Sequence, residues 1–156
     1  MLSQLHTESE YKALLVDRKE WNPYPRLSER DAWESLPKDI RESLIKRGES
    51  HLGFDWPTLP ATILLQFARE GNRSNYEAIS FERRNKLLGL VIAECVEGEG
   101  RFLDDIVNGV WAICEESYWG VPAHLNLQKA GSGLPDTAER TVDLFVAETF
   151  NLLAWT

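Results

Sequence analysis

The sequence predicts an all-α protein of about six helices organised as helical hairpins. Three observations lead to this prediction. Apolar residues recur at steps of three or four over several long segments, which is the period of one helix face. Residues that start and stop helices are frequent between these segments. Signals for strands are nearly absent, because the chain contains neither a clear alternating run nor an Asn-Gly hairpin turn.

The first quarter of the chain predicts short helices separated by irregular segments. Residues 1–26 indicate a short helix and then a loop that is rich in tryptophan, tyrosine and proline. Ser28 precedes a second short helix. Ser35 and Pro37 open a third helix, and we expect Gly48 to end it.

The middle of the chain predicts a short helix and then a long one. The short helix follows Pro60 and ends at Gly71. Ser74 and Glu77 have the spacing of a capping box, so they mark the start of the long helix, which Gly98 ends. The expected apolar face of this helix consists of Leu87, Leu88, Val91, Ile92 and Cys95.

Two further helices are predicted on either side of a long loop. The first ends near Ser117, and its expected apolar face is Phe102, Ile106, Val107, Val110, Trp111 and Cys114. The loop 118–135 is long for a compact domain, and such loops often carry function. Asp136 and Glu139 form a second pair with capping-box spacing. The last helix should run through Val142, Phe145, Val146, Thr149, Leu152 and Leu153.

The length and composition indicate one globular domain, residues 1–156, with no second domain. An apolar fraction of 43% is sufficient for a core. No apolar run approaches the ~20 residues that span a bilayer, so no membrane association is expected. The N-terminus lacks a signal peptide, which favours the cytoplasm, or the periplasm or a secreted location if a leader has been removed. Because no stop signal follows the last helix, we also expect the chain to be part of a longer protein; fraying is the alternative.

The charge and the cysteines exclude several classes of function. A net charge of −8 argues against a nucleic-acid binder, which needs a basic face. Arg83, Arg84 and Lys86 form a local basic cluster, which we interpret as a solvated helix face. Cys95 and Cys114 form no CxxC pair, so we expect buried free thiols and no zinc or redox site. The motifs GxSxG, Walker A, GxGxxG and HExxH are missing, so no cofactor or metal is predicted.

The segment EESYWGVPAH, residues 115–124, combines acids, aromatic rings and a histidine at the end of a predicted helix. Acids are unfavourable at that end by a few tenths to ~1 kcal/mol, because the helix dipole is negative there. Glu115 and Glu116 could therefore mark a functional site. The more common alternative is that they are solvated or paired with a neighbouring arginine. Trp119 could be an exposed plate for a sugar ring or a clamp that holds the loop to the core. His124 could transfer a proton, although a lone histidine more often makes a structural hydrogen bond.

Three stretches resemble the N-terminal region of heparinase II/III-like proteins. They are WPTLPATILLQFAREGNR, RRNKLLGLVIAECVEGEGRFLDDIVNGVWAICEESYWGVPAH and LPDTAERTVDLFVAETFNLLAWT. The resemblance covers about residues 55–156, and the combination of its second and third stretches is its most specific part. It implies an incomplete (α/α) toroid of helical hairpins, which a β-sandwich domain usually follows. It also implies a polysaccharide lyase that cleaves uronic-acid-containing glycans by β-elimination.

The resemblance carries over only some site residues. The family's catalytic Asn-His pair and tyrosine motif have no match here, so the catalytic residues stay unknown, with His124 and Glu116 as candidates. The resemblance assigns substrate contact to Glu115, Tyr118, Trp119 and His124. The expected partner is an acidic polysaccharide or oligosaccharide, and this chain alone should be inactive. An unfinished toroid would also favour self-association through its open end.

Two other functions remain open at the level of the sequence. One is hydrolysis on a similar helical toroid, with Glu116 and Asp105 as the paired acids. The other is a non-catalytic helical module that binds a glycan or a protein. The products distinguish hydrolysis from elimination, because only elimination leaves an unsaturated sugar.

Overall fold

The computed structural model describes residues 5–139 and 141–156, and every regular element in these residues is a helix. This confirms the predicted all-α class. The elements are α1 (Glu8–Leu14), α2 (Arg30–Glu34), α3 (Lys38–Glu49), α4 (Ala61–Leu64), α5 (Gln66–Glu70), α6 (Ser74–Glu97), α7 (Leu103–Cys114), the 3-10 helix η2 (Pro122–Leu127) and α8 (Leu144–Trp155).

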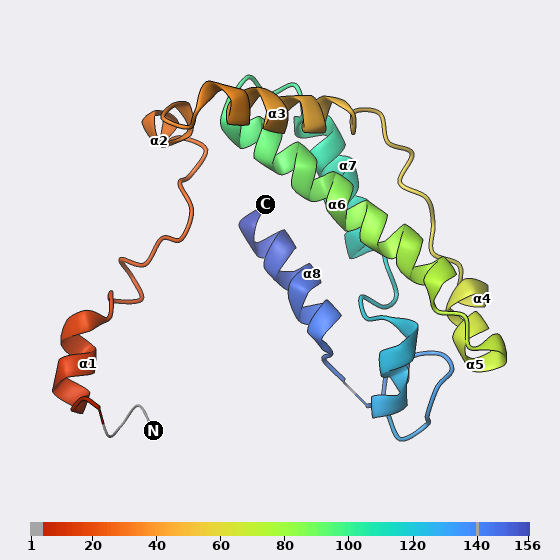
Figure 1. Ribbon diagram of the computed structural model, residues 1–156. Helices are drawn as coiled ribbons and strands as arrows, with labels where there is room; N and C mark the ends of the chain where they lie inside the picture. The colour runs from red at the N-terminus through yellow and green to blue at the C-terminus, as the bar shows by residue number, and fades with distance from the viewer. Residues whose placement is uncertain (1–4, 140) are drawn as a thin grey trace.

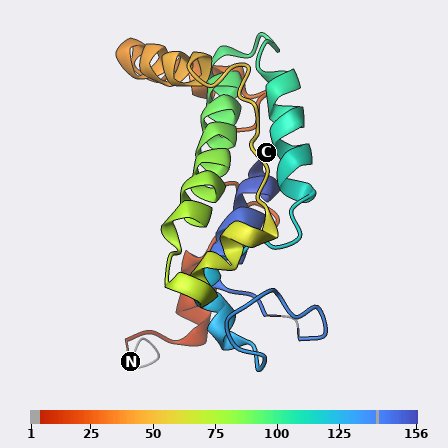
Figure 2. The ribbon, with the colours of Figure 1, turned by 90° about the vertical axis from the view of Figure 1, so that its right-hand side faces the viewer.

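The long helix α6 is the centre of the fold. Helices α3 and α7 make the most extensive contacts with it: α7 returns alongside it, and α3 crosses it near its C-terminal end (Figures 1 and 2). Helices α4 and α5 lie at the opposite end of α6, close to η2 (Figure 1). Helix α8 lies on a further side of α6 with fewer contacts. The antiparallel pair α6–α7 is the helical hairpin that the sequence predicts.

The main core lies between α6 and α7. Its buried members are Leu87, Leu90, Ala93, Phe102, Ile106 and Ile113. The predicted faces are partly wrong, because Leu88 of α6 and Val107 and Trp111 of α7 are exposed. Both α3 and α7 pack on α6. The buried face of α6 therefore includes Leu90 and Ala93 and leaves Leu88 exposed.

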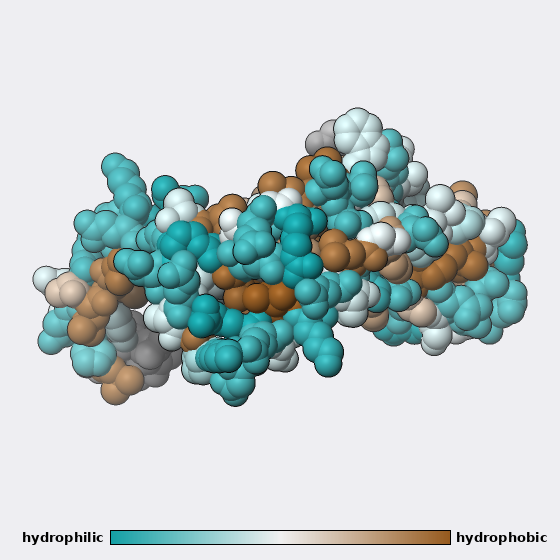
Figure 3. Space-filling view, turned by 90° about the horizontal axis from the view of Figure 1, so that it is seen from above, coloured by the Kyte–Doolittle hydropathy of each residue, from teal (hydrophilic) through white to brown (hydrophobic). Residues whose placement is uncertain are grey.

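Apolar side chains also reach the surface, where they form patches between polar ones in the view from above (Figure 3). On α7 the exposed residues Leu103, Val107 and Trp111 follow one another at steps of four. They therefore form a stripe on the side of α7 that faces away from the core.

Gly48 has a different role from the one that the sequence predicts. It lies inside α3, which ends at Glu49, and it is buried where α3 crosses α6. A Cβ atom at Gly48 would lie 2.2 Å from the Cβ of Ala93. The glycine therefore allows the two helix backbones to approach closely, and it does not stop the helix.

The C-terminal ends of α5 and α6 lie where the sequence predicts. Gly71 and Gly98 have φ angles of 73° and 74°, the left-handed conformation that ends a helix. The Arg30 side chain also caps α6, because its guanidinium donates hydrogen bonds to the carbonyl oxygens of Cys95, Val96 and Glu97. This contact ties the N-terminal segment to the long helix.

Both predicted capping boxes are wrong. Ser74 is the first residue of α6 and does not cap it, while the Glu77 carboxylate forms an ion pair with Arg73. No helix starts near Asp136, whose carboxylate accepts a hydrogen bond from the amide of Ala138 in a tight turn. A capping box does form at Thr7 and Glu10, at the start of α1.

The prediction of two buried thiols is only partly correct. Both cysteines are free, but Cys95 is half-buried and Cys114 is exposed at the end of α7. Burial raises the pKa of the Cys95 thiol above its usual value, so this group is protonated at neutral pH. Within residues 5–139 and 141–156, no helix has the length and apolar character needed to cross a membrane.

Candidate functional site

The chain that leaves α7 is held against the core by Trp119. The Trp119 indole N–H donates a hydrogen bond to the carbonyl oxygen of Ile113, with a distance of 2.8 Å, and the ring packs on the main core. Trp119 is therefore the clamp that the sequence allowed, and its ring is not an exposed plate for stacking on a sugar.

Glu116, one of the two catalytic candidates, forms a buried ion-pair cluster. Only 3% of its side chain is exposed. Its Oε1 lies 3.1 Å from Nη1 of Arg83, and its Oε2 lies 2.7 Å from Nη2 of Arg84. The two guanidinium groups offset the unfavourable position of the acid at the negative end of α7. Glu115, by contrast, is exposed.

The expected solvated basic face is wrong for both arginines of this cluster. Arg83 is 4% exposed and Arg84 is 6% exposed, while Lys86 is half-buried. The periodicity contains the signal, because Arg83 and Arg84 precede the buried Leu87 by four and three residues. Positions at those steps share a helix face, so the same pattern that found the core could have placed them on it.

Arg84 joins three segments of the chain. Its Nε donates to the hydroxyl of Thr149 in α8 at 2.7 Å, and its Nη1 donates to the hydroxyl of Ser80 at 2.9 Å. Its guanidinium also lies 4.9 Å from the centre of the Phe145 ring. Together with the bond to Glu116, these contacts connect α6, the end of α7 and α8.

Arg83 has few partners for a buried cation. Among the described residues, its contact with Glu116 is an ion pair without hydrogen-bond geometry, and its Nε is buried with no hydrogen-bond partner. Burial lowers the pKa of Arg83, and the nearby Glu116 carboxylate partly opposes this effect. The buried cluster therefore holds two guanidinium groups against one carboxylate.

His124, the second candidate, is held by an acid that the sequence analysis did not identify. Its Nδ1 lies 2.6 Å from Oδ2 of Asp143. The imidazole is 36% exposed, whereas the Asp143 side chain is 3% exposed. Oδ1 of Asp143 accepts a hydrogen bond from the amide of Val146, so this acid also caps α8. Because a carboxylate only accepts, Nδ1 donates, and Nε2 is left without a partner among the described residues.

The position of Asp143, three residues before Val146, could have predicted that this acid caps the last helix. An aspartate placed before a run of apolar residues is a typical N-cap. Its pairing with His124, 19 residues earlier, depends on how the loop between them folds.

Tyr118 lies beside the same carboxylate. A Cβ atom at Gly120 would lie 2.2 Å from the Tyr118 hydroxyl and 2.9 Å from Oδ2 of Asp143, so both groups approach the glycine closely. Burial, and then the negative charge of Asp143, raise the pKa of Tyr118 to about 12. The hydroxyl is therefore protonated at neutral pH. The Tyr76 hydroxyl in turn donates to the carbonyl oxygen of Tyr118 at 3.1 Å.

A pocket of about 550 Å³ opens next to this cluster. Its walls come from the segment before α4, from α6, from the end of α7 and from the loop after η2. Three of the predicted site residues line it, namely Glu115, Glu116 and Tyr118. His124 and Trp119 do not, so the structure separates the predicted residues into a pocket group and a neighbouring His124–Asp143 pair.

One wall of this pocket carries backbone strain. Trp56 has a φ angle of +50°, which is unfavourable by about 1–3 kcal/mol for a residue other than glycine. Packing against α7 holds Trp56 in this conformation. The Trp56 ring lies directly on Gly109, where a Cβ atom would be only 2.3 Å from it. The indole therefore fills a notch that only glycine provides, and its N–H is buried without a hydrogen-bond partner among the residues that the structure describes.

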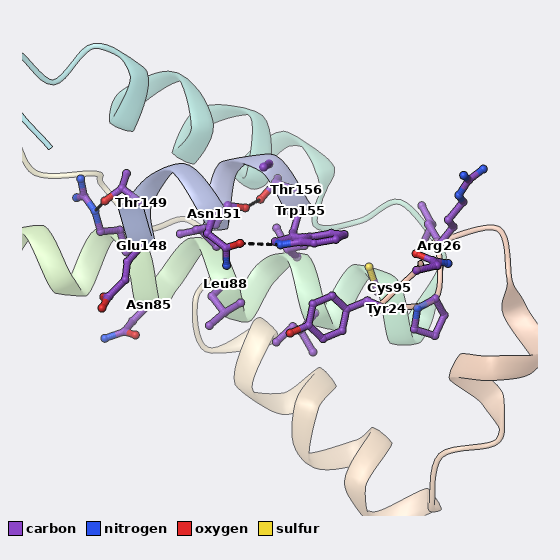
Figure 4. Close-up of a pocket in the computed structure, with 18 of the residues that line it drawn as sticks. Tyr24, Arg26, Asn85, Leu88, Cys95, Glu148, Thr149, Asn151, Trp155 and Thr156 are labelled. Carbon is purple, nitrogen blue, oxygen red and sulfur yellow. Dashed lines mark hydrogen bonds between the residues drawn. The ribbon is translucent and has the colours of Figure 1, made fainter. Parts of the chain in front are cut away.

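A larger groove of about 1080 Å³ lies between α6, α8 and the segment that precedes α2 (Figure 4). Tyr24 and Trp155 meet edge to face in it, with ring centres 5.4 Å apart. The Trp155 indole donates a hydrogen bond to Asn151, as the dashed line in Figure 4 shows. The lining is mainly apolar, and none of the predicted site residues contributes to it.

The cluster offers proton-transfer and anion-binding groups rather than metal ligands. No group of three or more His, Cys, Asp or Glu side chains that could hold a metal ion occurs in the part of the chain that the structure describes. Comparisons with known proteins add no assignment, since no protein-family model matches the chain and no curated protein matches it either.

Proposed function

We propose that this chain belongs to a heparinase II/III-like polysaccharide lyase that cleaves uronic-acid-containing glycans by β-elimination. In this proposal the helices form part of an (α/α) toroid, and the segment after α7 contacts the substrate. The observation that carries the proposal is the pair of His124 and Asp143, in which a buried carboxylate orients a partly exposed imidazole.

The arrangement of His124 suits contact with a sugar that reacts by elimination. Such a reaction needs groups that accept a proton beside the sugar carboxylate, balance its charge and donate a proton to the leaving oxygen. The bond from Nδ1 to Asp143 fixes the tautomer, so Nε2 can accept a proton or a hydrogen bond from the sugar. The protonated Tyr118 hydroxyl lies near the same carboxylate and is a donor.

The helical hairpin supports the toroid part of the proposal. An (α/α) toroid repeats antiparallel helix pairs, and α6–α7 is such a pair. The exposed stripe of Leu103, Val107 and Trp111 on α7 is where a neighbouring hairpin would pack.

A binding experiment tests the contact at His124. Isothermal titration with hyaluronan oligosaccharides is expected to show binding to the chain and weaker binding to the His124→Gln variant. His6→Gln is the matched control, because His6 is an exposed histidine far along the chain from this site. Equal affinities for the wild type and His124→Gln would remove His124 from the substrate contact.

A turnover experiment tests the reaction type. The chain is incubated with heparan sulfate, hyaluronan and alginate, and the ultraviolet absorbance of the unsaturated product is followed. We expect no rise from this chain alone, since the family's Asn-His pair and tyrosine motif have no match in it. A clear rise would contradict this inactivity and support the lyase chemistry. New reducing ends without a rise would favour hydrolysis.

The hydrolytic alternative is weakened by the position of its acids. Asp105 lies in the first turn of α7, where its Oδ1 accepts a hydrogen bond from the amide of Gly53, and Glu116 follows the last turn. The nine helical steps from Asp105 to the end of α7 at Cys114 already span about 13 Å along the axis, beyond the roughly 5–9.5 Å that paired acids of glycosidases require. Glu116 is also engaged by two arginines. A non-catalytic glycan-binding module remains the second candidate, and binding without turnover from any longer form of the protein would favour it.

A further inference from the structure

We infer that the pocket bounded by Trp56, Tyr76, Arg83 and Tyr118 is a binding site for a compact organic carboxylate that carries a flat or ring-shaped body. The carboxylate would be held by Arg83, and the ring would lie among the aromatic side chains. This inference concerns a different group of residues from the His124–Asp143 pair, and it does not depend on the glycan-lyase proposal.

The first argument is the charge balance of the buried cluster. Arg83 and Arg84 share the single carboxylate of Glu116, so one positive charge remains without a buried counterion. Arg84 has its remaining donors engaged by Ser80 and Thr149. Because Arg84 makes the bidentate bond to Glu116, Arg83 is the cation whose charge is only partly compensated, and a buried charge is stable only when it is paired.

The second argument is the supply of unused donors. Arg83 carries five N–H donors; its Nη1 lies 3.1 Å from Oε1 of Glu116, and its Nε has no hydrogen-bond partner within the described residues. Among those residues, only four buried side-chain atoms lack a hydrogen-bond partner, and two of them, Nε of Arg83 and Nε1 of Trp56, belong to residues that line this one pocket. Unsatisfied buried polar groups are rare in folded proteins, and each of them calls for an explanation. Both atoms are donors that lie buried behind the pocket wall, so the polar groups left unpaired beside this pocket favour an acceptor.

The third argument is the shape and lining of the pocket. Its volume of about 550 Å³ falls within the range of about 300–1,000 Å³ that is common for small-molecule sites. Rings of Trp56, Tyr76 and Tyr118 line it, and such rings favour a flat or ring-shaped body. The strained backbone at Trp56 is a further sign, because such conformations are concentrated at ligand sites.

The charges around the pocket favour a ligand with one carboxylate over a polyanion. Glu115 lies at the mouth and is exposed, so water and salt weaken its repulsion of an incoming anion. A small monoanion encounters the least of this repulsion and satisfies the one unpaired cation.

The ligand chemistry is tested with four probes on the complete chain. Sodium benzoate and sodium glucuronate carry the carboxylate on an aromatic ring and on a sugar ring, and benzamide and glucose are the corresponding neutral molecules. Binding is followed by tryptophan fluorescence and by isothermal titration calorimetry. We expect at least one carboxylate to bind at least about tenfold more tightly than its neutral counterpart, because the bond to Arg83 is charge-assisted. The preferred carboxylate identifies the ring class, and equal binding of the charged and neutral forms would overturn the inference.

Three variants locate the binding. Arg83→Gln should weaken carboxylate binding at least about tenfold, because it removes the cation. Ala112→Phe fills the pocket from α7 without altering any charge, and it keeps the inference testable if Arg83→Gln does not fold. Arg41→Gln is the matched control, because Nε of Arg41 is also buried with no hydrogen-bond partner in residues 5–139 and 141–156, but Arg41 does not line this pocket. Wild-type affinity in Ala112→Phe, or an equal loss in Arg41→Gln, would refute the assignment.

A fourth variant separates this inference from the proposed function. His124→Gln should reduce binding of hyaluronan oligosaccharides and leave binding of the small carboxylate unchanged, since His124 does not line the pocket. Weaker carboxylate binding in this variant would contradict the pocket assignment, and unchanged hyaluronan binding would contradict the substrate contact at His124.

Discussion

Arg84 and Glu116 form a bidentate ion pair that connects α6 with the exit of α7. Nη2 of Arg84 lies 2.7 Å from Oε2 of Glu116, and Nη1 lies 3.2 Å from Oε1. Arg83 approaches the same carboxylate from the next position of α6. Glu116 thus neutralises part of the charge that two buried arginines bring into the protein interior.

Removal of this acid should destabilise the fold. Glu116→Gln leaves two buried guanidinium groups without a counterion, and breaking a buried pair in this way typically costs about 3–5 kcal/mol. The free energy of unfolding is measured by urea titration followed by circular dichroism. Glu115→Gln is the matched control, since this neighbour is exposed and its replacement should change stability by no more than about 0.5 kcal/mol. Similar values for the two variants would contradict a structural role for the Glu116 cluster.

The crossing of α3 and α6 should not tolerate a methyl group at Gly48. Alanine is favoured over glycine inside a helix by about 1 kcal/mol. The new Cβ would meet the Cβ of Ala93 at 2.2 Å, and such overpacking costs about 1–3 kcal/mol or more. We therefore expect Gly48→Ala to lower the melting temperature. Ser43→Ala, on an exposed position of the same helix, should maintain or raise it. A melting temperature for Gly48→Ala at or above that of the wild type would show that the helices do not cross there.

Asp143 should contribute to stability through three hydrogen bonds, which its carboxylate accepts from the amides of Val146 and Val121 and from Nδ1 of His124. Asp143→Ala removes the N-cap of α8, which costs about 0.5–2 kcal/mol, and also the partner of His124. Asp143→Asn keeps a side chain that caps equally well, so its loss of stability should be smaller. Urea titrations of both variants measure the difference. Equal losses would mean that the cap contributes nothing and that the charge alone matters.

Stability should decrease in alkaline solution as Tyr118 titrates. The ordinary pKa of tyrosine is 10.0, and in the folded protein the pKa of Tyr118 is raised to about 12. Above pH 10 the unfolded chain loses this proton while the folded chain retains it, so the free energy of unfolding falls with rising pH. The stabilising contribution is complete below pH 10 and is lost as the pH approaches about 12.

Urea titrations between pH 8 and pH 11 check this dependence. Tyr118→Phe has no proton to lose, so the fall in its stability over that range should be smaller than in the wild type. Tyr76, whose pKa is also raised by burial, should maintain part of the slope in both proteins. Identical slopes for the wild type and Tyr118→Phe would show that the hydroxyl is not shielded from water.

The sequence was most informative about features that depend on residues close to one another along the chain. Helical periodicity and turn residues act within a few positions, so the all-α class and the ends at Gly71 and Gly98 could be predicted from local signals. Capping signals were less reliable. Ser74 and Asp136 each have a glutamate three residues later, but Glu77 forms an ion pair with Arg73 and the Asp136 carboxylate accepts a hydrogen bond within a turn. The last helix, α8, therefore begins at Leu144 and not just after Asp136.

The candidate site was only partly predictable. The sequence drew attention to five residues, Glu115, Glu116, Tyr118, Trp119 and His124, and the structure brings Glu115, Glu116 and Tyr118 to one pocket but neither Trp119 nor His124. It missed Asp143, and it placed Arg83 and Arg84 in solvent, although both are buried. These errors share a cause, because a charged residue can be buried only when a partner from another part of the chain meets it.

The sequence alone therefore determined that this protein is built of helices and that two of them end at Gly71 and Gly98, since hydrogen bonds within a helix and the preferences of single residues are local. Only the tertiary structure decided which charges are buried, because Arg83 and Glu116 are 33 residues apart and meet only when α7 returns along α6. It also decided that Gly48 serves a helix crossing and that Trp119 is a clamp. Packing between distant segments sets these roles, and no local pattern encodes the distance at which two helices meet.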